Sequence, residues 1–278
     1  MPYRRVARST TSILGKYLAD RGPHLAAMVA YYALLAIFPF VFLTLSALGL
    51  LGQVSESSYV IQELKRILPV ESEDSLISNV RTLQDNAQTF FWIGIIGMFW
   101  SSLGFYSALE SALNIIFRVS NRGFIRGKGL GVVFVLGSLG MLFVMLSIST
   151  TAAGWVHRHT SEGAVTTLAT IGIPLIASGI ASFVFLVVVY RVLTNVELHR
   201  GDVWPGAMFG AVLFAISFQM VPIYIQFATN LVTLQVFGGI VLLLVWLYLM
   251  ANIIVLGAEI NWRHWARTQP PEEVSGLA

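Results

Sequence analysis

The hydrophobic residues of this chain are grouped into five long stretches that contain no Asp, Glu, Lys or Arg. These stretches are residues 25–55, 88–109, 129–157, 163–190 and 203–258. Each exceeds the roughly 20 residues that an α-helix needs to cross a bilayer. The last stretch is too long for one span, and a polar cluster from Thr229 to Gln235 divides it into two. The pattern therefore predicts an all-α, polytopic membrane protein with six transmembrane helices, at about 25–51, 90–117, 130–156, 165–190, 204–227 and 237–258.

The segments between and after these helices are short, apart from an outer loop at residues 52–89. Apolar residues recur in this loop at helical spacing, and Pro69 divides it, so we expect two short amphipathic helices on the outer face. The last residues, 268–278, are predicted to form a disordered tail. The whole chain, residues 1–278, is thus predicted to be a single integral membrane domain.

The composition excludes several classes of protein. Hydrophobic residues make up 56% of the chain and charged residues 11%, whereas soluble domains are roughly a quarter charged. A soluble enzyme, a DNA-binding domain and a disordered chain are therefore excluded as descriptions of the whole. The absence of cysteine also excludes thiolate metal sites, disulfides and a thiol nucleophile.

Basic residues are distributed unevenly between the two sides of the predicted membrane. Of the 17 Lys and Arg residues, those in the N-terminal arm, the second and fourth loops and the tail outnumber those in the other loops by more than three to one. The positive-inside rule then places both termini in the cytoplasm. The net charge of +3 needs no nucleic acid to explain it, because these residues lie at membrane edges. We expect Arg122, Arg126 and Lys128 to bind anionic lipid headgroups.

Glu110 is the strongest candidate functional residue, because an ionisable group inside a span must be offset by a partner or by water. Asn114 and Arg118 follow at i+4 and i+8, so the three residues form a polar stripe running towards the cytoplasmic end. Two interpretations stay open: an ion pair that fixes helix packing, or a substrate or proton pathway. The expected partner of Glu110 is Arg118, or else Arg191 from the end of the fourth helix.

Glu259 lies at the end of the sixth helix, and Asn252 lies seven residues earlier on about the same face. A structural pairing of Glu259 with cytoplasmic arginines is the simpler interpretation, and a role in a pathway is the alternative. Polar or aromatic residues near prolines in the first and fifth helices complete the candidates for a cavity: Tyr31, Tyr32, Gln219, Tyr224 and Gln226.

No catalytic, metal-binding or cofactor-binding motif is recognisable in the sequence. The five histidines all lie at membrane edges, and Glu197, His199 and Asp202 read as a solvated cluster of loop charges. The glycine-rich basic segment 123–131 lacks the spacing of a phosphate-binding loop. We therefore expect no catalytic residues, no metal site and no cofactor.

Several motifs, in the right order along nearly the whole chain, resemble those of the YihY/virulence factor BrkB family of bacterial inner-membrane proteins. They are Ala30-Tyr31-Tyr32-Ala33 with Phe38-Pro39, Ala108–Asn114, Tyr190–Val196, Trp204-Pro205-Gly206-Ala207, Tyr224, Phe237-Gly238-Gly239, Trp246-Leu247-Tyr248 and Gly257-Ala258-Glu259. The family usually has proline where Thr194 stands. The resemblance implies six helices with cytoplasmic termini, and it implies no established reaction.

Three functions follow as hypotheses. The first is transport or lipid handling, in which a small or amphipathic solute moves through a cavity that contains Glu110, Asn114 and the polar half of the fifth helix. The second is a scaffold for envelope assembly, which needs no cavity. The third is the ribonuclease activity of an old family label. That activity would require clustered carboxylates for two metals at the cytoplasmic face, and the candidates near the helix ends there are Glu197, Asp202 and Glu259.

Overall fold

A computed structural model of the chain describes residues 12–50, 86–123, 127, 129–131, 137, 164–229 and 238–268. The main elements of these ranges are helices, and no strand occurs within them, which agrees with the predicted all-α class. The helices are α2 (Ile13–Ala19), α3 (Gly22–Leu50), α6 (Ala87–Phe117), α8 (Ala164–Val188), the π-helix η2 (Val189–Leu193), α9 (Arg200–Thr229) and α10 (Gly238–Thr268).

Four of these helices are long and apolar enough to cross a membrane, namely α3, α6, α9 and α10. They coincide with the first, second, fifth and sixth predicted spans. The fourth span forms α8, which continues directly into η2, and the apolar helical stretch Ser178–Leu193 is shorter than the other four. Nearly all of the third span, the outer loop and the tail lies outside the described residues.

Helix α10 continues to Thr268, past the end of the predicted sixth span at about residue 258. The polar residues after Ala258 do not stop the helix. Glu259 and Asn261 are buried in its next turn and have partners on other elements, so tertiary contacts sustain the helix beyond the apolar run.

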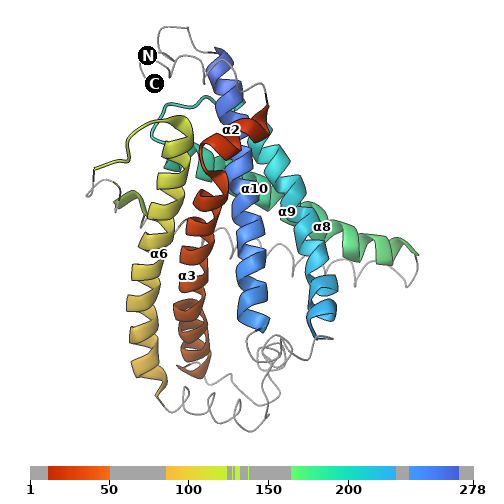
Figure 1. Cartoon of the computed structure of the whole chain (residues 1–278). Coiled ribbons are helices and arrows are strands. Elements are labelled where there is room, and N and C mark those ends of the chain that lie inside the picture. The colour runs from red at the N-terminus through yellow and green to blue at the C-terminus, as the bar shows by residue number, and fades with distance from the viewer. Residues whose placement is uncertain are drawn as a thin grey trace.

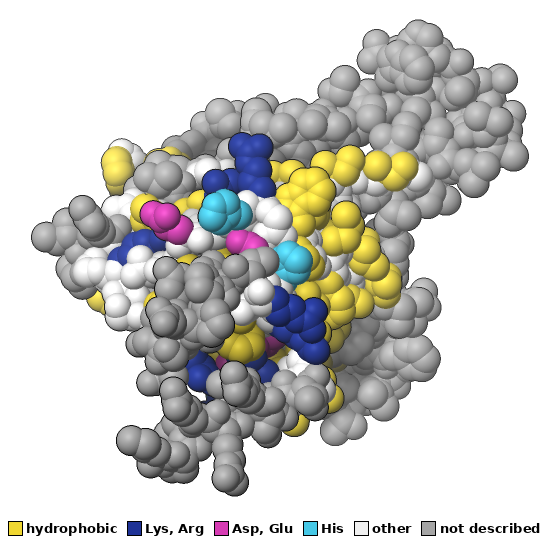
Figure 2. All heavy atoms as spheres, turned by 90° about the horizontal axis from the view of Figure 1, so that it is seen from above, with side chains coloured by type: hydrophobic (Ala, Val, Ile, Leu, Met, Phe, Trp, Pro, Cys, Tyr) yellow, Lys and Arg dark blue, Asp and Glu magenta, His cyan; other side chains and the backbone are white. Residues whose placement is uncertain are grey.

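Helices α6, α3, α10 and α9 stand side by side, and α8 leans away from them beyond α9 (Figure 1). Helix α2 lies across one end of this bundle, where α10 also ends. The segments 118–123 and 194–199 lie at the same end, which we call the loop end. Figure 2 shows this end face, on which charged and histidine side chains gather beside a margin of hydrophobic ones.

Glycines allow α9 and α10 to approach closely near the loop end. A Cβ atom on Gly206 would overlap the carbonyl oxygen of Gly257, and a Cβ atom on Gly257 would overlap the hydroxyl of Tyr190. The backbone N–H of Gly206 donates to Oδ1 of Asn261 at 2.7 Å, and the Tyr190 hydroxyl donates to the Ile254 carbonyl at 2.9 Å. The small residues of α9 thus serve as close packing positions.

Candidate functional site

The loop end contains two buried ionic centres. The first is built around Lys16 of α2, which is only 6% exposed. Its ammonium donates to Oε2 of Glu259 at 2.6 Å, to the carbonyl oxygen of Ile116 at 3.1 Å and to Oδ2 of Asp20. It also lies 4.1 Å from the centre of the Trp262 ring. An ammonium has three protons to donate, so these three acceptors use its full capacity.

Helix α2 reaches this position because of its own local sequence. The Ser12 hydroxyl accepts from the Gly15 backbone N–H and caps the helix, and Arg21 ends it with a positive φ of 57°. The adjacent Tyr17 is also buried, and its hydroxyl donates to Oδ1 of Asn252. Helix α2 therefore contacts both Asn252 and Glu259, which the sequence places on one face of α10.

The second centre surrounds Glu110 of α6, which is 5% exposed. Its Oε1 accepts from the backbone N–H of Arg122 at 3.2 Å and lies 3.5 Å from Nη1 of the same residue. The prediction that Glu110 pairs with Arg118 or Arg191 is therefore wrong. Arg118 ends α6 in a left-handed conformation with a φ of 59°, which turns the chain so that Arg122 returns to Glu110. Arg191 is exposed on η2.

For Glu259, the expected pairing with cytoplasmic arginines also requires correction. The residue in contact is Lys16, and Arg118 contributes only a longer-range favourable interaction. Both errors have the same origin, because each partner is set by how a loop or a short helix folds back on the bundle.

Asn114 connects α6 to two loops. Its Nδ2 donates to Oδ1 of Asn121 at 3.0 Å, and its Oδ1 accepts from the backbone N–H of Asn195 at 2.8 Å. Asn195 in turn donates from Nδ2 to the carbonyl of Ser120 at 3.0 Å. Asn114 is fully buried, so its amide holds the 118–123 and 194–199 segments against the end of α6.

Arg122 extends the second centre to the exit of η2. Its Nη1 donates to the carbonyl of Leu193 at 2.8 Å, and its Nη2 donates to the carbonyl of Thr194 at 2.9 Å. Thr194 has φ −70° and ψ 131°, a backbone conformation that proline adopts readily. Threonine at this position is therefore compatible with the same chain path as the proline usual in the resembling sequences.

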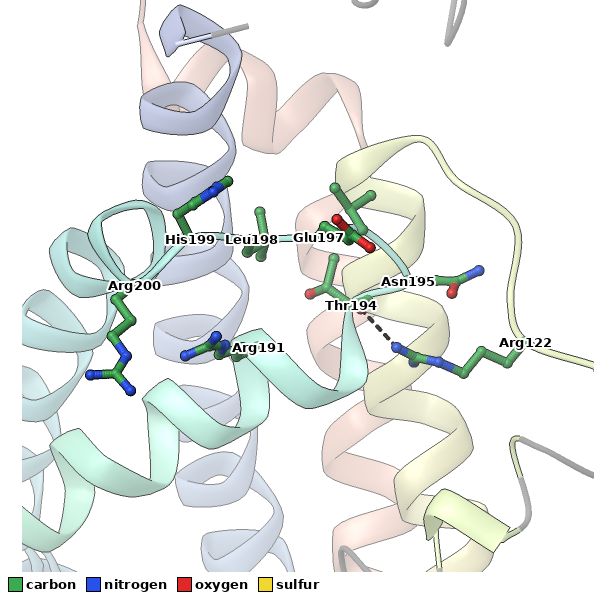
Figure 3. Close-up of a pocket in the computed structure, with 9 residues that line it drawn as sticks. Arg122, Arg191, Thr194, Asn195, Glu197, Leu198, His199 and Arg200 are labelled. Carbon is green, nitrogen blue, oxygen red and sulfur yellow. Dashed lines mark hydrogen bonds between the residues drawn. The ribbon is translucent and has the colours of Figure 1, made fainter.

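A pocket of about 540 Å³ opens beside these contacts, between the end of η2 and the start of α9 (Figure 3). Its lining is mainly polar and basic, and consists of Arg122, Arg191, Thr194, Asn195, Val196, Glu197, Leu198, His199 and Arg200. Arg122 approaches the 194–199 segment from one side, and Arg191 and Arg200 lie on the other (Figure 3). Arg191 and Arg200 are exposed, and neither has an acidic partner within 4 Å in the described part of the chain.

The three loop charges near this pocket behave differently from one another. Glu197 and His199 are exposed, as expected for a solvated cluster. Asp202 is only 6% exposed, and its Oδ2 accepts from the His199 backbone N–H at 3.0 Å. The interpretation of Asp202 as a solvated charge is therefore wrong, because this carboxylate caps the start of α9.

The remaining predicted cavity residues are not all brought together. The rings of Tyr31 and Tyr32 pack edge to face at 5.4 Å, and Tyr31 is exposed. The side chains of Gln219, Tyr224 and Gln226 lie outside what the structure describes, although α9 runs through these positions. Neither Glu110 nor Asn114 lines the pocket, so a pathway through them stays a prediction.

Comparison with known proteins places the chain in a family. The family model described as "Virulence factor BrkB" matches residues 13–275. The chain belongs to the virulence factor BrkB family. The resemblance seen in the sequence motifs is thereby confirmed, and the two ionic centres and the pocket are features of a BrkB-family membrane protein.

Individual relatives of this BrkB-family chain have low sequence identity to it, but they align with most of its length. A ribonuclease-like protein, YfkH, of Bacillus subtilis is 27% identical over 94% of this chain and 96% of its own length. A UPF0761 membrane protein of Pseudoalteromonas atlantica is 28% identical over 85% of this chain and 79% of its own. One from Azotobacter vinelandii is 27% identical over 92% of this chain, which spans 64% of that relative. No solved structure matches the chain.

Sequence reasoning missed the residues that complete the two centres in this BrkB-family chain. Lys16 and Asp20 are separated by four positions, which is a helical ion-pair spacing, but α2 has only seven residues and gives no periodic signal. Asn121 and Asn195 lie in loops, and only their polarity distinguishes them. Within the described ranges, no three His, Asp or Glu side chains form a group that could hold a metal ion.

Proposed function

We propose that this chain is an inner-membrane protein with cytoplasmic termini that transports or handles an anionic amphiphile, and that the headgroup binds in the pocket beside η2. The observation that carries the proposal is the pair of exposed arginines, Arg191 and Arg200, which line the pocket and have no acidic partner within 4 Å among the described residues. Guanidinium groups bind phosphate oxygens through paired hydrogen bonds. Arg122 is a third donor in the same pocket.

Arg122 also links the pocket to the intramembrane carboxylate. Its guanidinium donates to two carbonyl groups at the exit of η2 and lies 3.5 Å from Glu110. A phosphate in the pocket would compete with Glu110 for this guanidinium. The proposed consequence is that headgroup binding loosens the junction between η2 and α6, so that the amphiphile can move past Glu110 and Asn114.

The binding step is tested by native mass spectrometry of the detergent-solubilised protein with phosphatidylglycerol and phosphatidylcholine. The wild type should retain phosphatidylglycerol preferentially, and Arg191→Gln/Arg200→Gln should lose most of this preference. Arg267→Gln is the matched control, because Arg267 is an exposed arginine at the same end that does not line the pocket. Equal binding by all three proteins would refute the headgroup site.

The transport step separates this proposal from a scaffold role. In proteoliposomes, the wild type should accelerate movement of a fluorescent phosphatidylglycerol between leaflets, and Arg191→Gln/Arg200→Gln should slow it. Binding without any acceleration would favour the scaffold. A ribonuclease activity has less support, because two of the three carboxylates considered for it make structural contacts: Glu259 contacts Lys16 and Asp202 caps α9.

The orientation is tested by introducing cysteines into this cysteine-free chain. Cysteines at Ser75 and Gly163 should react with an impermeant thiol reagent added to intact cells. Cysteines at Ser120 and Ser275 should react only after the membrane is permeabilised. Labelling of Ser120 from outside would reverse the proposed topology and move the pocket to the outer face.

A further inference from the structure

Helix α2 has an inverted distribution of polar and apolar side chains. The side that faces the bundle carries Lys16 and Tyr17, which are buried and hydrogen-bonded to α6 and α10. The opposite side carries Leu14 and Leu18, which are 63% and 60% exposed. These leucines are four positions apart and therefore lie on one face. A helix beside water has the reverse arrangement, so the surface outside α2 is expected to be apolar.

The contacts of α2 fix its depth along α10. Lys16 contacts Glu259, and Tyr17 contacts Asn252, which lies about 10 Å deeper along the helix axis at 1.5 Å per residue. Asn252 lies within the charge-free run of α10, and Glu259 is the first residue after the end of that run. Helix α2 therefore lies beside the end of the apolar run of α10, at the level where the sequence predicts the membrane edge.

Basic residues flank α2 in the sequence. Arg21 follows it and is exposed, and Arg4, Arg5 and Arg8 precede it in the sequence. Basic residues next to an apolar helical face favour binding to anionic lipid at the boundary between headgroups and acyl chains.

We propose that α2 is an in-plane membrane anchor whose Leu14 and Leu18 side chains insert into an anionic lipid leaflet at the loop end, while Lys16 and Tyr17 attach the helix to α6 and α10. The occupant of the exposed face is the bilayer itself. This surface is separate from the proposed headgroup pocket, because none of the residues of α2 lines that pocket.

The test uses single cysteines at Leu14 and Leu18, each carrying a nitroxide spin label, in vesicles of phosphatidylcholine with or without phosphatidylglycerol. Oxygen, which concentrates in lipid, and a water-soluble nickel chelate should relax the label to different extents. The ratio of oxygen to nickel accessibility should be clearly higher at Leu14 and Leu18 than at a label on Ser120. Ser120 is an exposed residue in a loop at the same end.

The two positions test the proposal independently, so failure of one labelled variant to fold leaves the other informative. A ratio at both leucines equal to that at Ser120 would place this face in water and overturn the proposal. Spin–spin coupling between labels at Leu14 or Leu18 of different copies would show that a second chain, and not lipid, covers this face. That result would also overturn the proposal. The ratio should rise when phosphatidylglycerol is present, and no change would refute the preference for an anionic leaflet.

Discussion

The two buried carboxylates at the loop end are held in different ways. Glu259 has no exposed side-chain surface and lies 2.6 Å from a lysine that comes from a separate element, α2. Glu110 lies 3.5 Å from Arg122, whose side chain is 19% exposed at the edge of a pocket, and it also accepts a backbone hydrogen bond. The first centre is thus sealed inside the protein, and the second is connected to the surface.

Because of this difference, the two centres at the loop end are expected to have different roles, one in stability and the other in activity. A sealed ion pair has already lost its hydration, so removing one charge leaves the other without compensation. At a pocket edge, one charge of an ion pair can exchange its partner for a ligand or for water at a smaller cost in free energy. We therefore assign the Lys16–Glu259 centre to stability and the Glu110–Arg122 centre to the proposed activity.

The largest effect is expected for Lys16→Met. The change keeps most of the side-chain volume but leaves Glu259 buried without its cation, which should lower the free energy of unfolding by about 3–5 kcal/mol. The measurement is a denaturation curve in detergent followed by tryptophan fluorescence. Arg267→Met is the control, because an exposed charge at the same end should change stability by only about 0.5 kcal/mol.

The companion double variant, Lys16→Met with Glu259→Gln, distinguishes charge from packing. Removing the uncompensated carboxylate should restore much of the lost stability. If the double variant is as unstable as Lys16→Met alone, the contacts of Lys16 with Asp20, Ile116 and Trp262 outweigh its pairing with Glu259.

A smaller effect is expected for Glu110→Gln. The amide oxygen can still accept from the Arg122 backbone N–H, but the charge on Arg122 loses its acidic partner, which should cost about 1–3 kcal/mol. Transport of the anionic lipid should fall much further than stability does, if Glu110 is part of the pathway. Unchanged transport in a well-folded Glu110→Gln protein would make this centre structural as well.

A double-mutant cycle identifies the partner of Glu110. Glu110→Gln should couple with Arg122→Gln and should be nearly additive with Arg118→Gln or Arg191→Gln. Coupling with Arg191 in solution would mean that the 118–123 segment exchanges between two arrangements.

The outcome for these two centres shows what a sequence pattern can predict. Long charge-free stretches predict α3, α6, α9 and α10 because each helix must satisfy its own backbone in lipid. The same reasoning identifies Glu110 and Glu259 as costly residues, and both are buried. Their partners follow from a seven-residue helix and a left-handed turn at Arg118, whose geometry depends on tertiary contacts rather than on periodicity.

The smallest effect is expected at Thr194, where the Arg122 centre uses the backbone and not the side chain. Arg122 donates to the Thr194 carbonyl, whereas the buried Thr194 hydroxyl has no hydrogen-bond partner within the described part of the chain. Thr194→Val replaces this hydroxyl with a methyl group of similar size and should leave stability unchanged or raise it by about 1 kcal/mol. Thr194→Ala removes the methyl group as well and should lower stability by about 1 kcal/mol. Because neither change alters the carbonyl, binding of phosphatidylglycerol should stay at the wild-type level in both variants. A loss of binding in Thr194→Val would show that the hydroxyl itself contacts the headgroup.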